Sequence, residues 1–524
     1  MEKKITVLDS TLRDGAQGEG ISFSIEDKLA IVKALDRLGI DYIEAGNPFS
    51  NPKDIEFFNR LNKLELKHSK IVAFGSTRRK DCTAEEDKNL QALLSAHTPA
   101  VAVFGKCWLL HVTNIINTDG KTNYDMIYDT VSFLKKQGKT VFFDAEHFFD
   151  GYKDNPEYAM GALQAAFDAG ADSLDLCDTN GGCFPDEIAE IVSKVSERFN
   201  GKVGIHTHND KGMAVANSVM AVLSGATQVQ GTFLGFGERC GNANLSTIIP
   251  NLQLSKNCIC IPKENMTSLT TIAREVAEIA NVSIKGNEPY VGSSAFAHKA
   301  GMQADGVLKL SRSFEHIDPS KVGNERRILM SEITGRGAVL EKIHKINPDI
   351  TKSSPETAKI LAELKELESK GYQFEGADSS FEMLIRRNLG AYKSFFKLLN
   401  YKIISGRPSE PGCLATATVK VQVGDKTQLM AAEGNGPINA LDKALRFSLE
   451  VFYPELKKMR LIDYKVRVMD SKSATASVVR VLITSTEGKN VWTTVGVSSD
   501  VVEASRLALT ESIEYMLIKY RENK

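Results

Sequence analysis

Residues 173–208 read SLDLCDTNGGCFPDEIAEIVSKVSERFNGKVGIHTH, and their pattern indicates the fold class of the first half of the chain. A short apolar run ends in polar residues, a helical segment follows over residues 186–199, and a second apolar run again ends in polar residues. A strand, a helix and a strand joined by short connections indicate two parallel strands with a right-handed crossover.

The same unit recurs along the first half of the chain. The apolar or β-branched runs begin at Ile5, Tyr42, Ile71, Val101, Val141, Ser173, Val203 and Gln228. The segments between them have a helical period; for example, Ile31, Ala34, Leu35 and Leu38 share one helix face that ends at Gly39. Eight such units match the size and strand count of a (β/α)8 TIM barrel. The alternative is an open doubly wound sheet, but no Gly-x-Gly-x-x-Gly follows the first strand.

We therefore predict an α/β fold with three parts: a TIM-barrel catalytic domain over residues 1–284, a helical linker over residues 285–390, and a C-terminal domain over residues 391–524. The stretch SGRPSEPG at 405–412 is a turn-rich break inside the last part.

The C-terminal part contains two similar segments. AAEGNGPINALDKALRFSLE begins at residue 431, and TTVGVSSDVVEASRLALTESIE begins at residue 493. Each predicts a strand, a glycine turn and a helix, so we expect a pseudo-symmetric α+β module. Chance similarity of two amphipathic helices is the weaker explanation, because the preceding strand and glycine match too.

Composition excludes several classes of protein. The 524 residues suggest two or three folded units, and 42% hydrophobic with 25% charged residues is typical of a globular protein. The 65 basic and 66 acidic residues give a net charge of −1, which offers no global attraction to nucleic acid or an anionic membrane. No apolar run is long enough for a signal peptide or a membrane span. Eight scattered cysteines without a CxxC pair indicate reduced thiols, so we expect a cytoplasmic protein.

Reactive groups of a TIM barrel gather at the carboxyl ends of its strands, and here a metal site is indicated. His206 and His208 are two apart on a strand, so both point into the barrel mouth. With Asp14, after the first strand, they supply the nitrogen and oxygen ligands of a divalent metal. Asn242 is a candidate fourth ligand through its amide oxygen, although a plain turn residue is equally compatible with CGNAN.

Three further residues at this end are candidates for chemistry. Arg13 offers a planar fork for a carboxylate or a developing oxyanion, and because it directly precedes Asp14 we expect the two not to pair closely. Glu146 ends an apolar run where burial could tune it for proton transfer, and a structural hydrogen bond to the following loop is the alternative. Thr179 is a hydroxyl donor that alone carries no functional signal.

The motifs DSTLRDGAQ at 9–17, HTHND at 206–210 and GERCGNAN at 237–244 resemble the metal-dependent Claisen-condensing barrel family. That family contains 2-isopropylmalate, homocitrate and citramalate synthases and, more distantly, the hydroxymethylglutaryl-CoA lyases. FDAEHFFDGYKDNPEYA and VQGTFLGFGERCGNANL look most like its citramalate synthase branch. EGNGPINALDKAL and GVSSDVVEASRLAL resemble the regulatory domain of isopropylmalate and citramalate synthases, so the likeness covers nearly the whole chain.

The resemblance implies a Claisen condensation of acetyl-CoA with pyruvate to citramalate and CoA, in isoleucine biosynthesis. It implies a divalent ion (Mn, Mg, Zn or Co) held by Asp14, His206, His208 and Asn242. It gives Arg13 and Glu146 catalytic roles and places Arg13, Gln17 and Thr179 around the substrates.

The linker is implied to complete the active site. Where the family usually has a histidine, this chain has Gln303, which cannot take a proton, so His298 is the local imidazole that could act instead. The C-terminal domain is implied to pair as a homodimer and to bind isoleucine, or leucine if the oxo acid is larger. Gly434, Gly436 and Gly496 are candidate effector-binding positions at helix N-termini. The alternative is that these glycines only form tight turns.

Three other functions stay open from the sequence. One is condensation with a larger 2-oxo acid, another is a metal-dependent acyl-CoA lyase, and the third is a non-catalytic metabolite-binding paralogue.

Overall fold

The computed structural model describes residues 2–522 except 51, 300–302, 304–305, 308, 330–335, 352, 407–414, 470–476 and 489. The chain forms two compact units: Met1–Phe296 with Ile317–Glu325, and Ala297–His316 with Arg326–Lys524. The second unit contains two separate hydrophobic clusters, one among its helices and one in its C-terminal module. The division into domains at 284 and 390 stays a prediction.

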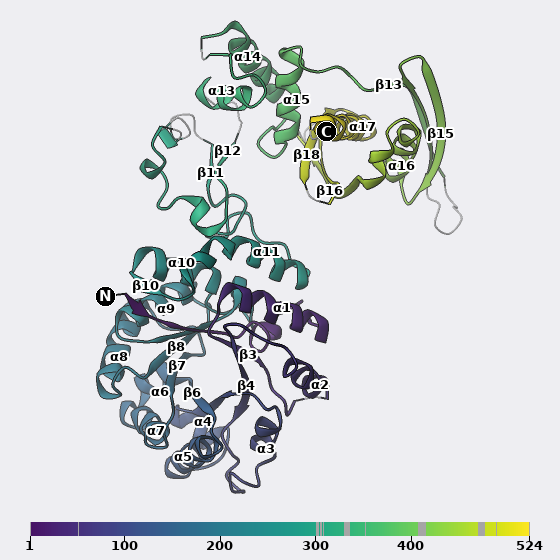
Figure 1. Ribbon diagram of the computed structural model, residues 1–524. Coiled ribbons are helices and arrows are strands. Elements are labelled where there is room, and N and C mark those ends of the chain that lie inside the picture. Colours follow the sequence, from purple (N-terminus) through teal and green to yellow (C-terminus); the bar gives the residue numbers. More distant parts are fainter. Residues whose placement is uncertain are drawn as a thin grey trace. The chain divides into compact units, whose positions relative to one another are not determined.

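The first unit contains a closed parallel barrel of eight strands, which confirms the TIM-barrel prediction (Figure 1). Neighbours in the sequence are neighbours in the barrel, and β2 closes the ring by pairing with β9. The strands are β2 Thr6–Asp9, β3 Tyr42–Gly46, β4 Lys70–Ser76, β5 Ala100–Lys106, β6 Thr140–Glu146, β7 Ser173–Asp178, β8 Val203–Thr207 and β9 Gln228–Gly231.

Helices surround the barrel on its outside (Figure 1). They are α1 Ile25–Leu38, α2 Pro52–Leu61, α3 Lys88–Ser95, α4 Leu109–Asn114, α5 Gly120–Lys136, α6 Phe148–Asp154, α7 Pro156–Asp168, α8 Pro185–Arg198, α9 Ala214–Leu223, α10 Leu245–Ser255 and α11 Leu269–Ile279. Two short strands, β1 Lys3–Lys4 and β10 Cys258–Ile259, pair beside them. No helix among the described residues is long and apolar enough to cross a membrane.

Helix α1 shows why these segments are helical. Ser24 accepts a hydrogen bond from the backbone of Asp27, whose side chain bonds back to Ser24, so both ends of a capping box are present. The predicted apolar face is buried, and Gly39 ends the helix in the left-handed conformation with φ 92°. Glycine adopts this φ without a steric penalty, which fixes the end of the helix.

The barrel has an apolar core outside its strands and a mixed core inside. Between strands and helices lies one large cluster of aliphatic and aromatic side chains. Inside, Leu8, Val72, Ala100, Ala102 and Phe142 form a separate small cluster. Most of the remaining interior positions of β6 to β9 carry polar side chains, which build the site described below.

The second unit begins with the short pair β11 Ala297–His298 and β12 Arg327–Ile328. Three helices follow: α13 Arg336–His344, α14 Pro355–Ser369 and α15 Asp378–Asn388. They surround a core that includes Ile360, Leu364 and Phe381. The helices expected over residues 285–390 are therefore present.

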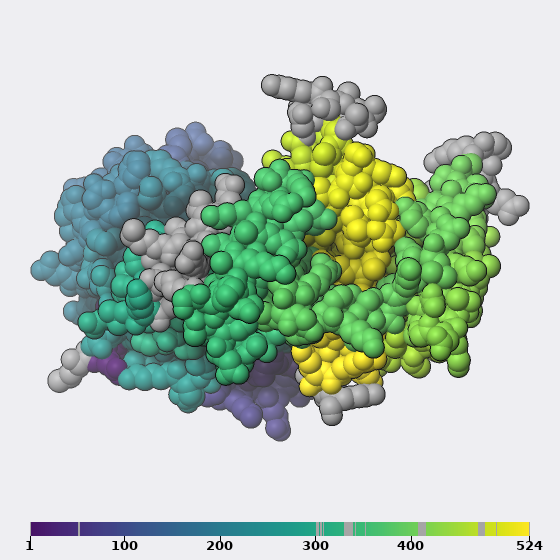
Figure 2. Space-filling view, turned by 90° about the horizontal axis from the view of Figure 1, so that it is seen from above, coloured from purple at the N-terminus to yellow at the C-terminus, as the bar shows by residue number. Residues whose placement is uncertain are grey.

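The C-terminal module is a duplicated unit of three antiparallel strands and one helix. The first copy comprises β13 Lys397–Ser405, β14 Ala415–Val423, β15 Lys426–Gly434 and α16 Pro437–Glu450, and the second comprises β16 Arg460–Val468, β17 Val479–Thr486, β18 Val491–Ser498 and α17 Val501–Glu522. The predicted repeat is confirmed, with additional strands in each copy. Most of the predicted break, residues 407–414, lies outside the described residues. In Figure 2 the yellow second copy lies between the green helices and the yellow-green first copy, and α15 contacts β18.

Two of the candidate effector glycines have a packing role in this module. A Cβ on Gly434 would lie 2.5 Å from the backbone nitrogen of Ala440, and one on Gly496 would lie 2.0 Å from the carbonyl oxygen of Ala504. Each strand therefore approaches its own helix closely enough to exclude any side chain. Gly436, at the N-terminus of α16, has open space around it.

Gly496→Ala is expected to lower the free energy of unfolding of the C-terminal module by about 1–3 kcal/mol, because α17 must move to admit the methyl group. Gly436→Ala is the matched control and should change it by less than about 0.5 kcal/mol. Urea unfolding followed by the fluorescence of buried Trp492, in a Trp108→Phe background, measures both. Equal midpoints for the two variants would contradict the packing role.

Candidate metal centre and active site

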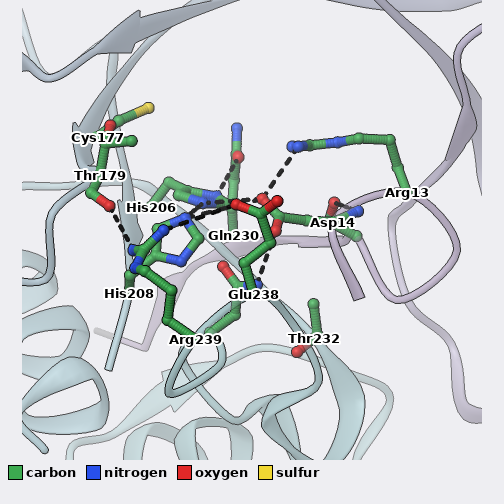
Figure 3. Close-up of polar contacts among 12 residues, drawn as sticks. Arg13, Asp14, Cys177, Thr179, His206, His208, Gln230, Thr232, Glu238 and Arg239 are labelled. Carbon is green, nitrogen blue, oxygen red and sulfur yellow. Dashed lines mark hydrogen bonds and ion pairs between the residues drawn. The ribbon is translucent and has the colours of Figure 1, made fainter. Parts of the chain in front are cut away.

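Three predicted metal ligands meet at the carboxyl end of the barrel. Asp14 follows β2, His206 lies in β8 and His208 directly after it, and all three are buried. Asp14 Oδ2 lies 3.4 Å from His206 Nε2 and 3.9 Å from His208 Nε2, and the two Nε2 atoms are 3.3 Å apart (Figure 3). The alternation of side chains along a strand puts both imidazoles on the interior face, as expected.

Asn242 lies against the same cluster. It forms an isolated bridge with His208, and its Nδ2 donates to Asp14 Oδ1 at 3.0 Å. Its buried Oδ1 has no hydrogen-bond partner among the described residues. A buried amide oxygen without a partner is costly, so this atom has a reason to bind something else.

The charges of the cluster suit a metal ion. Burial opposes ionisation of Asp14, but the charge of Arg13 and the hydrogen bond to His206 lower the pKa of this carboxyl well below its ordinary value. Burial and the neighbouring His206 lower the pKa of His208 to about 4, so this imidazole is neutral at neutral pH. Burial also lowers the pKa of His206, but Asp14 outweighs it and raises that pKa above its ordinary value.

These residues fit a divalent ion. Two imidazole nitrogens and one carboxylate oxygen, all within 4.8 Å of one another, form a mixed nitrogen and oxygen donor set. The orphaned Oδ1 of Asn242 adds a further oxygen at the same place. Among the described residues, the polar contacts of the two facing Nε2 atoms are with each other and with Asp14 Oδ2.

Arg13 and Asp14 form an ion pair, so the prediction that these two neighbours would not pair closely was wrong. Arg13 Nη1 lies 3.0 Å from Asp14 Oδ2, while Arg13 Nε donates to Glu44 Oε2 at 2.7 Å. The short turn after β2 folds the Arg13 side chain back alongside its neighbour, and the guanidinium lies 3.9 Å from the ring centre of Phe74. The fork is thus held on two carboxylates at the edge of the pocket.

Glu44 was missed by the sequence analysis. It lies in β3, fully buried, where it bonds Arg13 and also accepts from the Ser10 hydroxyl. The available signal was a carboxylate in the middle of the apolar run YIEAG, because a buried charge requires a partner.

Glu146 and Thr179 lie at the ends of β6 and β7. Glu146 forms an ion pair with Lys106 of β5, which the sequence analysis did not anticipate. The Thr179 hydroxyl accepts from the backbone nitrogen of His147 at 2.9 Å, so it helps to shape the start of the loop after β6.

A pocket of about 240 Å³ connects these groups. Its lining includes every predicted barrel residue except Asn242, together with two aromatic side chains and two charged side chains from the loop after β9. The residues are Arg13, Asp14, Gln17, Phe74, Phe104, Asp144, Glu146, Cys177, Thr179, His206, His208, Glu238 and Arg239. Figure 3 shows Arg13, Asp14 and the histidines converging from opposite sides of the barrel mouth.

The remaining candidates lie in the second unit. His298 Nε2 is 3.2 Å from Glu315 Oε1, and Arg326 bonds the same carboxylate. Gln303 is exposed and helical. The pocket above is lined by the first unit alone, so the catalytic role of His298 stays a prediction, as do the effector roles of the three glycines.

The fold and this site define a class of protein, a TIM barrel with a candidate metal site at its mouth and an appended α+β module. Matches to known families agree with it: residues 4–276 match the HMGL-like domain, residues 290–372 the homocitrate synthase post-HMGL domain-like family, and residues 375–517 the LeuA allosteric (dimerisation) domain.

The chain belongs to the family of citramalate and 2-isopropylmalate synthases. It is 51% identical to the (R)-citramalate synthase of Aquifex aeolicus, over all of this chain and 99% of that protein. It is 48% identical to the (R)-citramalate synthase of Geobacter sulfurreducens (99% and 98% covered) and 30% identical to the 2-isopropylmalate synthase of Pyrococcus furiosus (98% and 99%). Among solved structures it is similar to the HMG-CoA lyase of Bacillus subtilis, at 22% identity and TM-score 0.46, over 54% of this chain and 95% of that one.

His208→Ala should abolish stoichiometric binding of a divalent metal, because it removes one of two nitrogen ligands while the buried Asp14 and His206 remain. Elemental analysis of the purified protein and Mn²⁺ titration of the metal-free protein measure this. His111→Ala, which changes a histidine of α4, is the control and should retain full occupancy. Full occupancy in His208→Ala would place the metal elsewhere.

Proposed function

We propose that this protein is a citramalate synthase, condensing acetyl-CoA with pyruvate to give (R)-citramalate and free CoA. The proposal rests on one observation: a single small pocket is lined by Arg13, Asp14, His206 and His208. The proposal is supported by relatives called (R)-citramalate synthase, which are 42–51% identical over almost the full chain.

The reaction needs a proton removed from the acetyl methyl group and negative charge stabilised on the keto oxygen. The methyl carbon then bonds to the keto carbon, the keto oxygen takes up a proton, and water cleaves the thioester to release CoA. We propose that Asp14, His206, His208 and Asn242 hold a divalent ion (Mn, Mg, Zn or Co). When bound, it would act as a Lewis acid on the 2-oxo acid.

The chain's own residues supply the other functions. Arg13, held on Glu44 and Asp14, presents its guanidinium where the keto oxygen becomes an alkoxide, and this preorganised charge lowers the barrier. Glu146, which forms an ion pair with Lys106, is the proposed proton acceptor. Gln17 and Thr179 line the pocket as polar contacts for the substrates.

The pocket favours a small 2-oxo acid. Phe74 and Phe104 stack at 5.5 Å between ring centres and form one wall of the 240 Å³ pocket. In this proposal the two rings line the side of the pocket that receives the substituent of the oxo acid, where a methyl group needs less room than a branched chain. Condensation with a larger oxo acid is therefore the second candidate, and it has the 30% identical 2-isopropylmalate synthases in its favour.

A second cavity adjoins the pocket and suits the large acyl donor. It has about 500 Å³ and shares Phe104 with the pocket. Its lining includes the apolar Ile115, Ile116 and Met126 and the charged Arg78, Arg79, Lys80, Asp81 and Lys106. Arg78 is paired with Asp129 and Lys106 with Glu146. Arg79 and Lys80 are exposed, and Lys80 donates only to the carbonyl oxygens of residues 116 and 117 in the hydrogen bonds recorded. This basic groove, lined by residues 76–81, 104–106, 115, 116 and 126, would hold the phosphates of CoA.

The C-terminal module is the proposed site of assembly and regulation. Along the edge strand β16, Ile462, Tyr464, Val466 and Val468 are 39–54% exposed. Their partners on β17 include the fully buried Val481 and Ile483, whereas these four side chains stay partly exposed even though the Tyr464 hydroxyl forms a hydrogen bond with Ser505 of α17. An exposed apolar strand edge favours pairing with a second copy, so we propose a homodimer. Isoleucine is the proposed effector, with leucine as the alternative, in isoleucine biosynthesis in the cytoplasm.

A thiol-release assay with acetyl-CoA and a panel of 2-oxo acids tests the function. Pyruvate should give the highest kcat/KM, and isoleucine should inhibit more strongly than leucine. Arg13→Lys keeps the charge but cannot span Glu44 and Asp14, so kcat should fall by about a hundredfold with the fold intact. Preference for a larger oxo acid would favour the second candidate, and cleavage of citramalyl-CoA without condensation would favour a lyase. No turnover with any oxo acid would leave the metabolite-binding alternative.

Replacing both Arg79 and Lys80 by Ala should raise KM for acetyl-CoA on the order of tenfold, because two phosphate-facing charges are lost. KM for pyruvate should change little. Lys194→Ala, an exposed lysine of α8 paired with Glu190, is the control. A rise in KM for pyruvate instead, or none at all, would show that CoA does not use the basic groove.

A further inference from the structure

A polar layer lies inside the barrel directly below the metal-ligand cluster. It comprises Asp144 of β6, Asp175 of β7, and Gln228 and Gln230 of β9, all at most 4% exposed. TIM-barrel interiors are usually filled by branched apolar side chains at such positions. Buried polar groups at this depth require mutual hydrogen bonds, so their arrangement is informative.

The amide of Gln230 connects the cluster to this layer. Its Oε1 lies 3.1 Å from His206 Nδ1, and its Nε2 donates to Asp144 Oδ1 at 2.9 Å (Figure 3 shows the contact with His206). A carboxylate oxygen can only accept, so the amide nitrogen must face Asp144 and the amide oxygen must face the imidazole. Nδ1 of His206 therefore carries a hydrogen.

Asp144 and Asp175 are paired on the neighbouring strands β6 and β7. Burial raises the pKa of Asp144 to about 6, although Arg13, His206 and the hydrogen bond from Gln230 oppose the rise, so this carboxyl is still an acceptor at neutral pH. Burial and the charge of Asp144 raise the pKa of Asp175. Asp175 accepts from the Ser173 hydroxyl at 2.6 Å and from Gln228 Nε2 at 3.0 Å. The deeper pair, Asp175 and Gln228, thus supports the layer without touching either histidine in the recorded hydrogen bonds.

We propose that Gln230 is a positioning residue which, oriented by Asp144, accepts the Nδ1–H of His206 and so aims Nε2 at Asp14 and His208, where a metal ion would take its lone pair. Metal-binding histidines need the lone pair on the ligating nitrogen, and a partner on the other nitrogen fixes that tautomer. Nδ1 of His208 has no such partner among the described residues. Gln230 therefore orients this pair of imidazoles through His206. This inference rests on the proposed metal site.

The experiment combines calorimetry and NMR on the full-length, metal-free protein. Titration with Mn²⁺ gives Kd, and ¹⁵N-labelled histidine reports the tautomer of His206 without any metal. Gln230→Leu removes the acceptor at similar volume, so Kd should rise on the order of ten- to a hundredfold and the Nδ1–H signature should be lost. Gln228→Leu is the matched control on the same strand and face, and should leave Kd within about twofold and the tautomer unchanged.

A charge-conserving exchange provides the rescue. The double variant Gln230→Glu with Asp144→Asn keeps one carboxylate and one amide in the layer but still places an acceptor against Nδ1. It should bind Mn²⁺ within a few-fold of the parent and retain the Nδ1–H tautomer, and it decides the question if Gln230→Leu does not fold.

Three results would overturn the inference. They are an unchanged tautomer and Kd in Gln230→Leu, an equal loss of affinity in Gln228→Leu, or loss of binding in a folded exchange variant. If the parent protein does not bind Mn²⁺, the proposed metal site fails, while the tautomer measurement still decides the role of Gln230.

Discussion

The pairing of the first barrel strand with the last is the constraint on which the site depends. Ser10 donates its backbone N–H to the Gly231 carbonyl at 2.8 Å, and the backbone of Phe233 donates to the Thr11 hydroxyl at 2.8 Å. This closure brings the turn after β2 against the loop after β9, where Asp14 and Asn242, 228 positions apart in the chain, share a hydrogen bond. An open sheet would leave Asp14 at one edge and the histidines far from it. Closure of the barrel therefore brings Asp14 and the two histidines together as one set of metal ligands.

The same closure explains what the sequence could predict. Strand and helix periods are local, so the eight strands, their helices and the duplicated C-terminal unit followed from patterns within about twenty residues. The metal cluster followed as well, because His206 and His208 share a face by simple alternation and strand order in a TIM barrel is fixed. Asp14 needed only the knowledge that the first and last strands are neighbours.

The contacts that were missed depend on strand register and on side-chain reach across the barrel. Glu44 meets Arg13 because β3 presents it at the height where the turn after β2 folds back, and no local pattern encodes that height. The ion pair of Lys106 with Glu146 likewise requires β5 and β6 to be in one register. The expectation that Arg13 and Asp14 would not pair was wrong for a related reason, since adjacency in an extended strand separates two side chains but adjacency in a tight turn does not.

The polar interior has a thermodynamic consequence for the barrel. Carboxylates and amides at the centre contribute little apolar burial, and each must be hydrogen-bonded to avoid a desolvation cost. The backbone of β8 lies close to the Asp175 side chain in this layer. A Cβ at Gly204 would lie 1.7 Å from Asp175 Oδ1, so β8 can carry only glycine there. The stability of the unit must come from the apolar cluster between strands and helices, which is large and continuous. The interior therefore contributes little of the apolar burial, and its hydrogen-bonded side chains can be arranged to orient the groups at the barrel mouth.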